Sequence, residues 1–284
     1  MSGPADTRQM TRDVARAARV PVSASRRPRP QQTSGLGGYA TYAASFLTLF
    51  LVWHVAATYV VPSVLFSPPL AVLDKLIELA RSGVLAEHVG VSLRRILIGF
   101  GLGSVLGIPI GLLMGNLRFA KRFLEPYTEF FRFIPAIAFL TVAVIWFGIG
   151  ETAKIFLIVY TTIFIVILNS MAGVLGIPKN KVRAAQCLGA SPWQIFFYVS
   201  IPATLPFILT GMRIAMGNSF ATIVSAEMLG ANAGLGTMMW TARLYMLVDE
   251  MFVGLFTLGI LGFATDRLFR FLIFRFAGKY SPVA

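Results

Sequence analysis

Residues that could carry out chemistry are few in this sequence, and they are widely spaced. It contains two histidines, His54 and His88, and one cysteine, Cys187. A single cysteine excludes an internal disulfide and a cysteine-cluster metal site, and two histidines on opposite sides of an apolar segment cannot supply a Ser-His-Asp set. HExxH and G-x-x-x-x-G-K-[ST] motifs are both absent. We therefore expect a chain that holds no metal or nucleotide and is not an enzyme on its own.

Charged side chains inside apolar segments are the other candidates for function. Arg213 and Glu227 lie 14 residues apart, which at about 3.6 residues per turn puts both on nearly the same helix face, about 21 Å apart. Charges at membrane depth usually face protein or water. Two interpretations stay open: this face lines a polar path, or Arg213 extends to the inner headgroups and Glu227 to the outer interface. Arg132 and Pro135 in FRFIPAIAF join them as path candidates, since Pro135 predicts an interrupted helix of the kind tolerated beside a cavity.

The elements that must position these residues follow from composition. Apolar residues make up 56% of the chain and charged residues 13%, with a mean hydropathy of +0.74, which is typical of an integral membrane protein. Segments long enough to cross a bilayer predict an all-α fold with about six transmembrane helices, at residues 39–61, 93–116, 130–148, 153–176, 205–229 and 251–273.

The distribution of basic residues predicts the topology. Segments on the side of the N-terminus hold 17 Lys and Arg, against six on the other side, so the positive-inside rule places both termini in the cytoplasm. The net charge of +13 thus reflects topology, and no nucleic-acid partner is expected. Residues 1–38, rich in Arg and Pro, are predicted to be a disordered cytoplasmic tail ahead of a membrane domain at 39–284. The tail is interpreted as a topology signal attracted to anionic lipid, with regulation as the alternative.

Two further patterns concern packing. The stretch 67–88 carries Leu70, Leu73, Ile77 and Leu79 among charged residues, which predicts an amphipathic helix at the outer surface. It is expected to pack on the flank of the domain, with substrate contact as the alternative. The second span has glycine at every fourth position, at Gly99, Gly103, Gly107, Gly111 and Gly115. This spacing predicts a close helix contact. The contact could lie within the chain, with a second copy, or at a sliding surface.

A cytoplasmic helix-turn-helix is predicted at 177–203. Pro178 suits the start of a short helix and Gly189 the left-handed residue that ends it, while Ser191 and Pro192 suit the cap and first residue of a second helix, which Pro202 is expected to end. The second helix is almost wholly apolar, which disfavours DNA binding and favours docking onto a protein.

This stretch, RAAQCLGASPWQIFFYVSIP, resembles the signature loop of the permease subunits of binding-protein-dependent ABC importers. Their pattern is Glu-Ala-Ala, three residues, Gly, nine residues and Ile-x-Leu-Pro; Ala184, Ala185, Gly189 and Pro202 match it, while Arg183 replaces the usual glutamate. FRFIPAIAFLTVAVIWFGIGETAKIF, LPFILTGMRIAMGNSF, SAEMLGANAGLG and SLRRILIGFGLGSVLGIPIGLLMG resemble the nitrate, sulfonate and taurine branch, over about residues 65–280.

The resemblance implies a type I importer permease in a bacterial inner membrane. It implies a second permease copy, two cytoplasmic ATPase subunits that hold ATP and Mg²⁺, and an external, periplasmic binding protein that delivers a small anion such as a sulfonate, taurine, nitrate or an organic acid. The ATPase-coupling residues would be Arg183, Ala184, Ala185, Gly189, Ala190, Ser191 and Pro192. The alternative is a membrane scaffold or signalling subunit that docks a cytoplasmic partner without moving solute.

Overall fold

A computed structural model describes residues 36–60, 66–228 and 230–277. The chain divides into two compact units, Met1–Leu51 and Val52–Ala284. Most of the predicted tail, residues 1–35, lies outside the described residues, whereas 36–38 already belong to a helix. The described residues contain helices and no strand, which confirms the all-α prediction.

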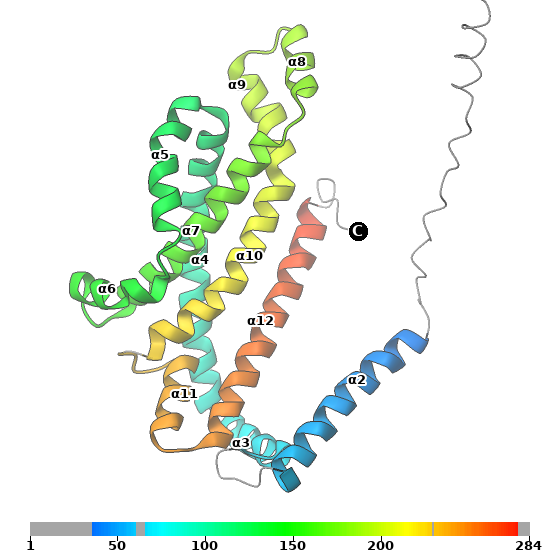
Figure 1. The fold of residues 1–284 in the computed structure, drawn as a ribbon, viewed down its shortest axis with the longest axis vertical. Helices are drawn as coiled ribbons and strands as arrows, with labels where there is room; N and C mark the ends of the chain where they lie inside the picture. The colour runs from blue at the N-terminus through cyan, green and yellow to red at the C-terminus, as the bar shows by residue number, and fades with distance from the viewer. Residues whose placement is uncertain (1–35, 61–65, 229, 278–284) are drawn as a thin grey trace, which may run out of the picture. The chain divides into compact units, whose positions relative to one another are not determined.

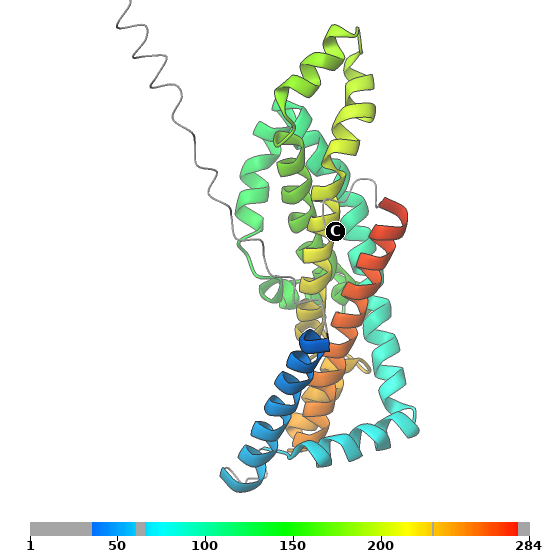
Figure 2. The same cartoon turned by 90° about the vertical axis from the view of Figure 1, so that its right-hand side faces the viewer.

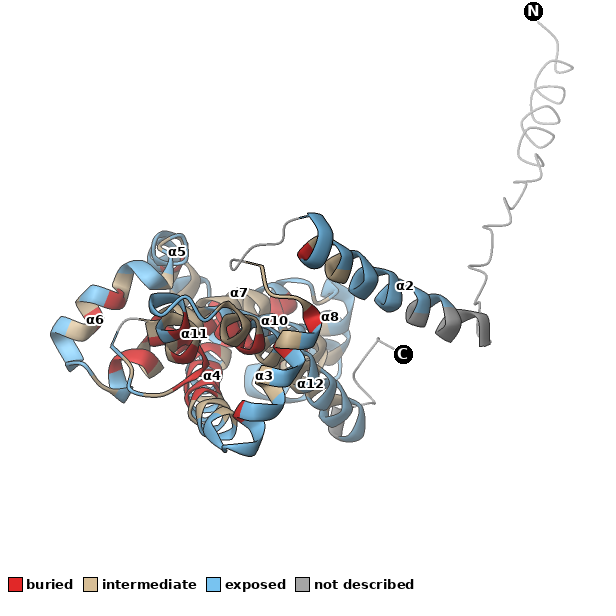
Figure 3. Cartoon of the chain, turned by 90° about the horizontal axis from the view of Figure 1, so that it is seen from below, coloured by how far each residue is buried: buried red, intermediate tan, exposed pale blue. Residues whose placement is uncertain are grey.

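Four long helices form the body of the second unit (Figure 1). They are long and apolar enough to cross a membrane, and they lie side by side in both side views (Figure 2). Buried residues gather on the first three and leave the fourth largely exposed (Figure 3). These helices are α4 (Val84–Asn116), α7 (Glu151–Leu175), α10 (Ile201–Met228) and α12 (Val248–Ala277).

The predicted glycine ridge lies along the contact between α4 and α7. A Cβ added at Gly103 would lie 2.6 Å from the Thr162 Cβ, and one at Gly111 would lie 2.5 Å from the Ile167 carbonyl oxygen. A Cβ at Gly99 or Gly115 would meet α7 at 2.6 or 2.5 Å, and one at Gly107 at 3.0 Å. The glycines therefore let the two helix backbones approach within the chain, as small residues do in membranes.

The third predicted span is not one straight helix. It is replaced by α5 (Arg118–Phe131), a 3₁₀ turn η2 (Ala136–Phe139) and α6 (Leu140–Phe147), with a bend of 86° between the two arms. The break falls at Pro135, as its type predicts, because proline disfavours helical backbone in the residue before it. The Tyr160 hydroxyl lies 2.5 Å from the Phe131 carbonyl oxygen and 3.3 Å from that of Ile134, and so supports the break.

The first predicted span, 39–61, falls on α2 (Leu36–Val55) and the π-helix η1 (Ala56–Val60). Its apolar part, Ala44–Val60, is shorter than the four long spans. Residue 61 lies outside the described residues. With the bent pair counted as one span, the described residues hold five candidates, so six spans are not all established.

The end of the bundle away from α8 and α9 is closed by α3 (Pro69–Arg81) and α11 (Leu235–Leu244), and α3 lies across it (Figures 1 and 2). The helix predicted from the apolar spacing is present as α3. Its residues Val72 and Leu79 pack with Leu235, Met238 and Val253. Of the four apolar residues that predicted it, Leu79 is buried, whereas Leu70, Leu73 and Ile77 are exposed.

Candidate coupling element and translocation path

The predicted turn of the coupling element has a regular C-cap. Helix α8 (Lys179–Cys187) is followed by its C-cap Leu188 and then by Gly189, whose φ is +78°. The Gly189 amide donates to the Gln186 carbonyl at 2.9 Å, and the Ala190 amide to the Ala185 carbonyl at 3.0 Å, which together make a Schellman motif. Only glycine adopts this backbone without strain. The structure thus places Gly189 at the turn, as its residue type predicted.

The second helix begins with a capping box. The Ser191 hydroxyl accepts a hydrogen bond from the Gln194 amide at 3.3 Å, and the Gln194 side chain accepts one from the Ser191 amide at 2.8 Å. Pro192 takes the first helical position, where its missing N–H removes no hydrogen bond.

Pro202 does not end this helix, contrary to the prediction. Helix α9 (Pro192–Ile195) runs through a π-helical segment η3 (Phe196–Ser200) into α10, so residues Pro192–Met228 form one candidate span. The wider π turn accommodates a proline that lacks an N–H and would clash with a carbonyl of a regular α-helix. The fifth span therefore starts 13 residues before the predicted Leu205, and the coupling turn is joined directly to a long helix.

The coupling element is open to solvent on its outer face. Leu188 is 89% exposed, Trp193 72% and Tyr198 80%. Of the predicted coupling residues, Ala185 and Ala190 are half-buried, while the exposed ones are Arg183, Ala184, Gly189, Ser191 and Pro192. Lys179 and Lys181 are also exposed, and no acidic residue occurs between Glu151 and Glu227. The element therefore offers apolar and positively charged side chains to a partner.

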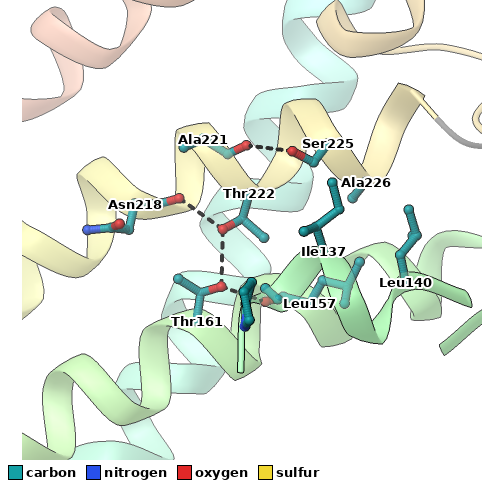
Figure 4. A pocket seen from close by; sticks show the side chains of 11 residues that line it. Ile137, Leu140, Leu157, Thr161, Asn218, Ala221, Thr222, Ser225 and Ala226 are labelled. Carbon is teal, nitrogen blue, oxygen red and sulfur yellow. Dashed lines mark hydrogen bonds between the residues drawn. The ribbon is translucent and has the colours of Figure 1, made fainter. Parts of the chain in front are cut away.

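Two adjoining cavities open where α5 breaks, between α7 and α10. One has a volume of about 260 Å³ and the other about 340 Å³, and both are lined by Pro135, Thr161 and Asn218. Thr161 and Thr222 point toward one another across the first cavity (Figure 4), with 3.1 Å between their hydroxyl oxygens. We call these two spaces the central cavity.

The polar lining of the central cavity comes mostly from one face of α10. Asn218, Thr222 and Ser225 recur at helical spacing, and all three line the cavity (Figure 4). Asn218 is exposed, and its amide donates only to the Ile214 carbonyl of its own helix among the described contacts. An apolar bundle with hydroxyl and amide groups facing an open space can offer hydrogen bonds to a passing solute.

Two of the four predicted path residues line the central cavity, and the other two lie elsewhere. Pro135 lines both parts of the central cavity and Arg132 lines one of them. Arg213 lies elsewhere and pairs with Asp266 of α12, with its Nε 2.5 Å from a carboxylate oxygen. Glu227 is 1% exposed and lies in a closed network. Arg213 and Glu227 thus have partners inside the protein, and neither of the two interpretations from the sequence had foreseen them.

The Glu227 carboxylate fastens the first turn of α11 to α4. It accepts hydrogen bonds from Arg95 at 2.8 Å, from the Ser92 hydroxyl at 2.8 Å and from the Gly236 amide at 2.9 Å. A Cβ at Gly234, whose φ is +132°, would lie 2.3 Å from the Glu227 carboxyl carbon. In the stretch SAEMLGANAGLG, Gly234 and Gly236 therefore let the backbone close around the Glu227 carboxylate.

Several site residues were missed from the sequence. Thr161, Thr222 and Ser225 gave a weak signal, because isolated hydroxyl residues also occur in apolar helices where they bond to their own backbone. The Ser92 and Arg95 contacts to Glu227 bridge 135 and 132 residues of sequence, which no local pattern can reveal. The adjacent arginines in SLRRILIGF were visible, but the partners of Arg95 were not.

The family "Binding-protein-dependent transport system inner membrane component" matches residues 107–278. The taurine transport system permease protein TauC of Escherichia coli is 39% identical over 225 residues, which cover 77% of this chain and 82% of that protein. A probable ABC transporter permease protein of Brucella melitensis is 41% identical over 206 residues, covering 72% and 84%. The nitrate import permease protein NrtB of Synechocystis is 35% identical over 188 residues, covering 66% and 68%.

Solved structures support the fold. An inward-facing structure of the MetNI methionine ABC transporter aligns with a TM-score of 0.56 at 23% identity and covers 66% of this chain and 95% of that chain. At this identity the likeness concerns the fold, which is that of a type I importer permease. The chain belongs to the binding-protein-dependent transport system inner membrane components, and it is a multi-pass permease subunit of an ABC importer.

Proposed function

We propose that this permease imports a small organic or inorganic oxyanion through the central cavity, in a complex with two ATPase subunits, a second copy of itself and an external binding protein. The observation that carries the proposal is the central cavity itself, where a helix break exposes hydroxyl and amide groups between α7 and α10. The anion class is supported by relatives named for taurine, nitrate and aliphatic sulfonates.

The coupling turn supports the second part of the proposal. Leu188 and Trp193 are exposed at a turn fixed by a Schellman motif and a capping box, so they can dock as a rigid unit with little loss of conformational entropy. ATP and Mg²⁺ would be held by the docked ATPase. Because the turn continues into α10, which also lines the central cavity, a displacement of the turn can change the cavity's opening. Alternating access requires such a contact whose energy differs between two states.

Orientation follows from the same assignment. The end with α8 and α9 lies in the cytoplasm, and the end with α3 and α11 faces the binding protein. Both termini are cytoplasmic in this proposal, in accord with the basic residues counted along the sequence. The docking surface of this chain is basic, since Arg183 stands with Lys179 and Lys181, and an acidic surface on the ATPase would complement it.

Ala221→Phe tests the path. Ala221 lines the central cavity and is exposed, so a phenyl ring there would fill the space without entering the core. In proteoliposomes with the cognate ATPase and binding protein, uptake of labelled taurine, alkanesulfonate or nitrate should be lost while membrane insertion is unchanged. The matched control is Val105→Phe, which adds the same kind of ring at a site on α4 that is 69% exposed.

Wild-type uptake by Ala221→Phe would place the path outside the central cavity. A different result would be a wild-type complex that binds its ATPase but transports none of these three solutes at any concentration of binding protein. That result would favour the alternative in which the chain is a membrane scaffold or signalling subunit. A solute-binding screen on the cognate external protein identifies which oxyanion to use.

A further inference from the structure

A separate cavity lies at the end of the bundle away from α8 and α9. It has a volume of about 430 Å³ and is lined by the start of α7, by residues of α4 and by the segment before α11. Ligand pockets in proteins commonly range from about 300 to 1,000 Å³. We call it the basic cavity and define it by Arg94, Arg95, Glu151, Lys154 and Asn232.

Arg95 is the one cation of this cavity whose charge is matched closely. Its guanidinium holds Glu151 through two hydrogen bonds of 2.7 and 2.5 Å, and it donates a third to Glu227 at 2.8 Å. It also donates to the Ala233 carbonyl at 2.7 Å. The hydrogen-bond donors of Arg95 are therefore used within the protein, and both nearby carboxylates, Glu151 and Glu227, are paired with it.

Lys154 is nearly as buried but is poorly paired. Its side chain is 6% exposed, its Nζ lies 4.0 Å from the nearest Glu151 oxygen, and its one hydrogen bond runs to the Gly150 carbonyl at 3.2 Å. Among the described residues, two of its three N–H groups have no acceptor. A buried ammonium with one long hydrogen bond is unfavourable unless a further acceptor is present.

Arg94 adds a further positive charge. Its side chain is exposed and lines the cavity, and it forms no ion pair or hydrogen bond with the described residues. Three cations, Arg94, Arg95 and Lys154, thus face two carboxylates, Glu151 and Glu227. The amide groups in the first turn of α7 add positive potential, since no side chain caps Gly150.

We propose that the basic cavity is a receiving site for a small oxyanion, held by Lys154 and Arg94 and contacted by Asn232. This inference rests on the proposed function, because it makes the cavity the first site that a delivered solute meets before the central cavity. An oxyanion with two or three oxygens can accept from an ammonium and a guanidinium at once. It would also give the buried Lys154 the acceptor that the protein does not supply.

Thiol modification measures the charge of the cavity directly. Asn232 is exposed, so Asn232→Cys in a Cys187→Ser background can react with a sulfonate-bearing and a trimethylammonium-bearing methanethiosulfonate reagent in the assembled complex. Ala86→Cys, exposed on α4 outside the cavity, corrects for intrinsic reactivity. We expect the sulfonate reagent to be favoured by about tenfold at position 232 at low ionic strength. Addition of Lys154→Gln should remove most of this preference, whereas Lys154→Arg should keep it.

Transport assays test whether Arg94 contacts the solute. Arg94→Gln should raise the apparent KM for uptake several-fold with stimulation of the ATPase by liganded binding protein retained, and Arg81→Gln, an exposed cation of α3, should change neither. Equal rates for the two reagents at position 232 in the Asn232→Cys, Cys187→Ser protein, with Arg94 and Lys154 intact, would overturn the inference. The inference would also be overturned if Arg94→Gln lowered only the affinity of the permease for the binding protein, because the cations would then contact an acidic side chain of that protein. Failure of the proposed function looks different, since the wild type would move no oxyanion at all.

Discussion

The contact between α4 and α7 can be tested by adding one methyl group at Gly111. A Cβ there would lie 2.5 Å from the Ile167 carbonyl oxygen and 2.7 Å from the Ser170 Cβ, where ordinary contact begins near 3.4 Å. The obstructing atom belongs to a helix backbone and cannot rotate away, so α4 and α7 must separate locally by about 0.9 Å. A gap of about that size forfeits a quarter to a half of the dispersion energy of the neighbouring contacts.

Overpacking of this kind costs about 1 to 3 kcal/mol. Alanine is favoured over glycine in a helix by about 0.5 to 1 kcal/mol, which partly offsets the loss. Gly101→Ala is the matched control, because Gly101 lies on the same helix and a Cβ there would meet nothing within 4 Å. Both variants gain the same helix preference, which cancels in the comparison, so they should differ by the overpacking cost alone, about 1 to 3 kcal/mol.

Unfolding in mixed micelles titrated with dodecyl sulfate, followed by tryptophan fluorescence, measures this difference. Gly115→Ala supplies a second test of the ridge, because its Cβ would lie 2.5 Å from the Val174 Cβ, which is fixed to the backbone of α7. It should also destabilise the protein relative to Gly101→Ala. If Gly111→Ala and Gly101→Ala unfold within about 0.5 kcal/mol of each other, the close packing of α4 on α7 is refuted.

Two more positions, one at the end of α10 and one in the turn between α8 and α9, can be tested by substitution. Glu227→Ala should lower the free energy of unfolding by about 3 to 5 kcal/mol, because it leaves Arg95 and the Gly236 amide without their acceptor. Glu227→Gln keeps one acceptor oxygen and should lose less stability. Equal stability of the wild type, Glu227→Ala and Glu227→Gln in the same micelle assay would contradict the network. Gly189→Val should uncouple ATPase stimulation from uptake, since φ of +78° strains a β-branched residue by about 1 to 3 kcal/mol. Gly189→Asn should retain more coupling, and unchanged transport by the valine variant would exclude this turn from coupling.

The coupling turn could be predicted because its signals are local. Gly189, Ser191 and Pro192 fix a C-cap, an N-cap and a first helical residue within four positions, and the structure has each in that place. Pro202 misled the prediction because a proline ends a helix only where the backbone cannot widen. The π-helical segment Phe196–Ser200 just before it provides that width, and no residue of that segment marks it in the sequence.

Burial of charge could not be predicted in the same way. Hydropathy identified Arg213 and Glu227 as costly, and their spacing correctly excluded pairing with each other. Their partners Asp266 and Arg95 lie 53 and 132 residues away, on helices whose neighbours are decided by packing. The glycine ridge was intermediate: its period predicted a close contact, but only the fold identifies α7 as the partner.

Helix α10 gives these separate features a common mechanical basis. Its start is continuous with the coupling turn, its middle presents Asn218 and Thr222 to the central cavity, and its end carries Glu227. The Glu227 end is anchored to α4 by buried hydrogen bonds, whereas the turn is exposed. The segment between the turn and α10 is held by a hydrogen bond from Ser200 to Asn116 of α4, at 3.1 Å, and by apolar packing against Leu112 and Val174. A force applied at the turn should therefore move the near end of α10 more than the far end. The central cavity lies between the two, so under the proposed function it would open or close by tilting about the Glu227 anchor.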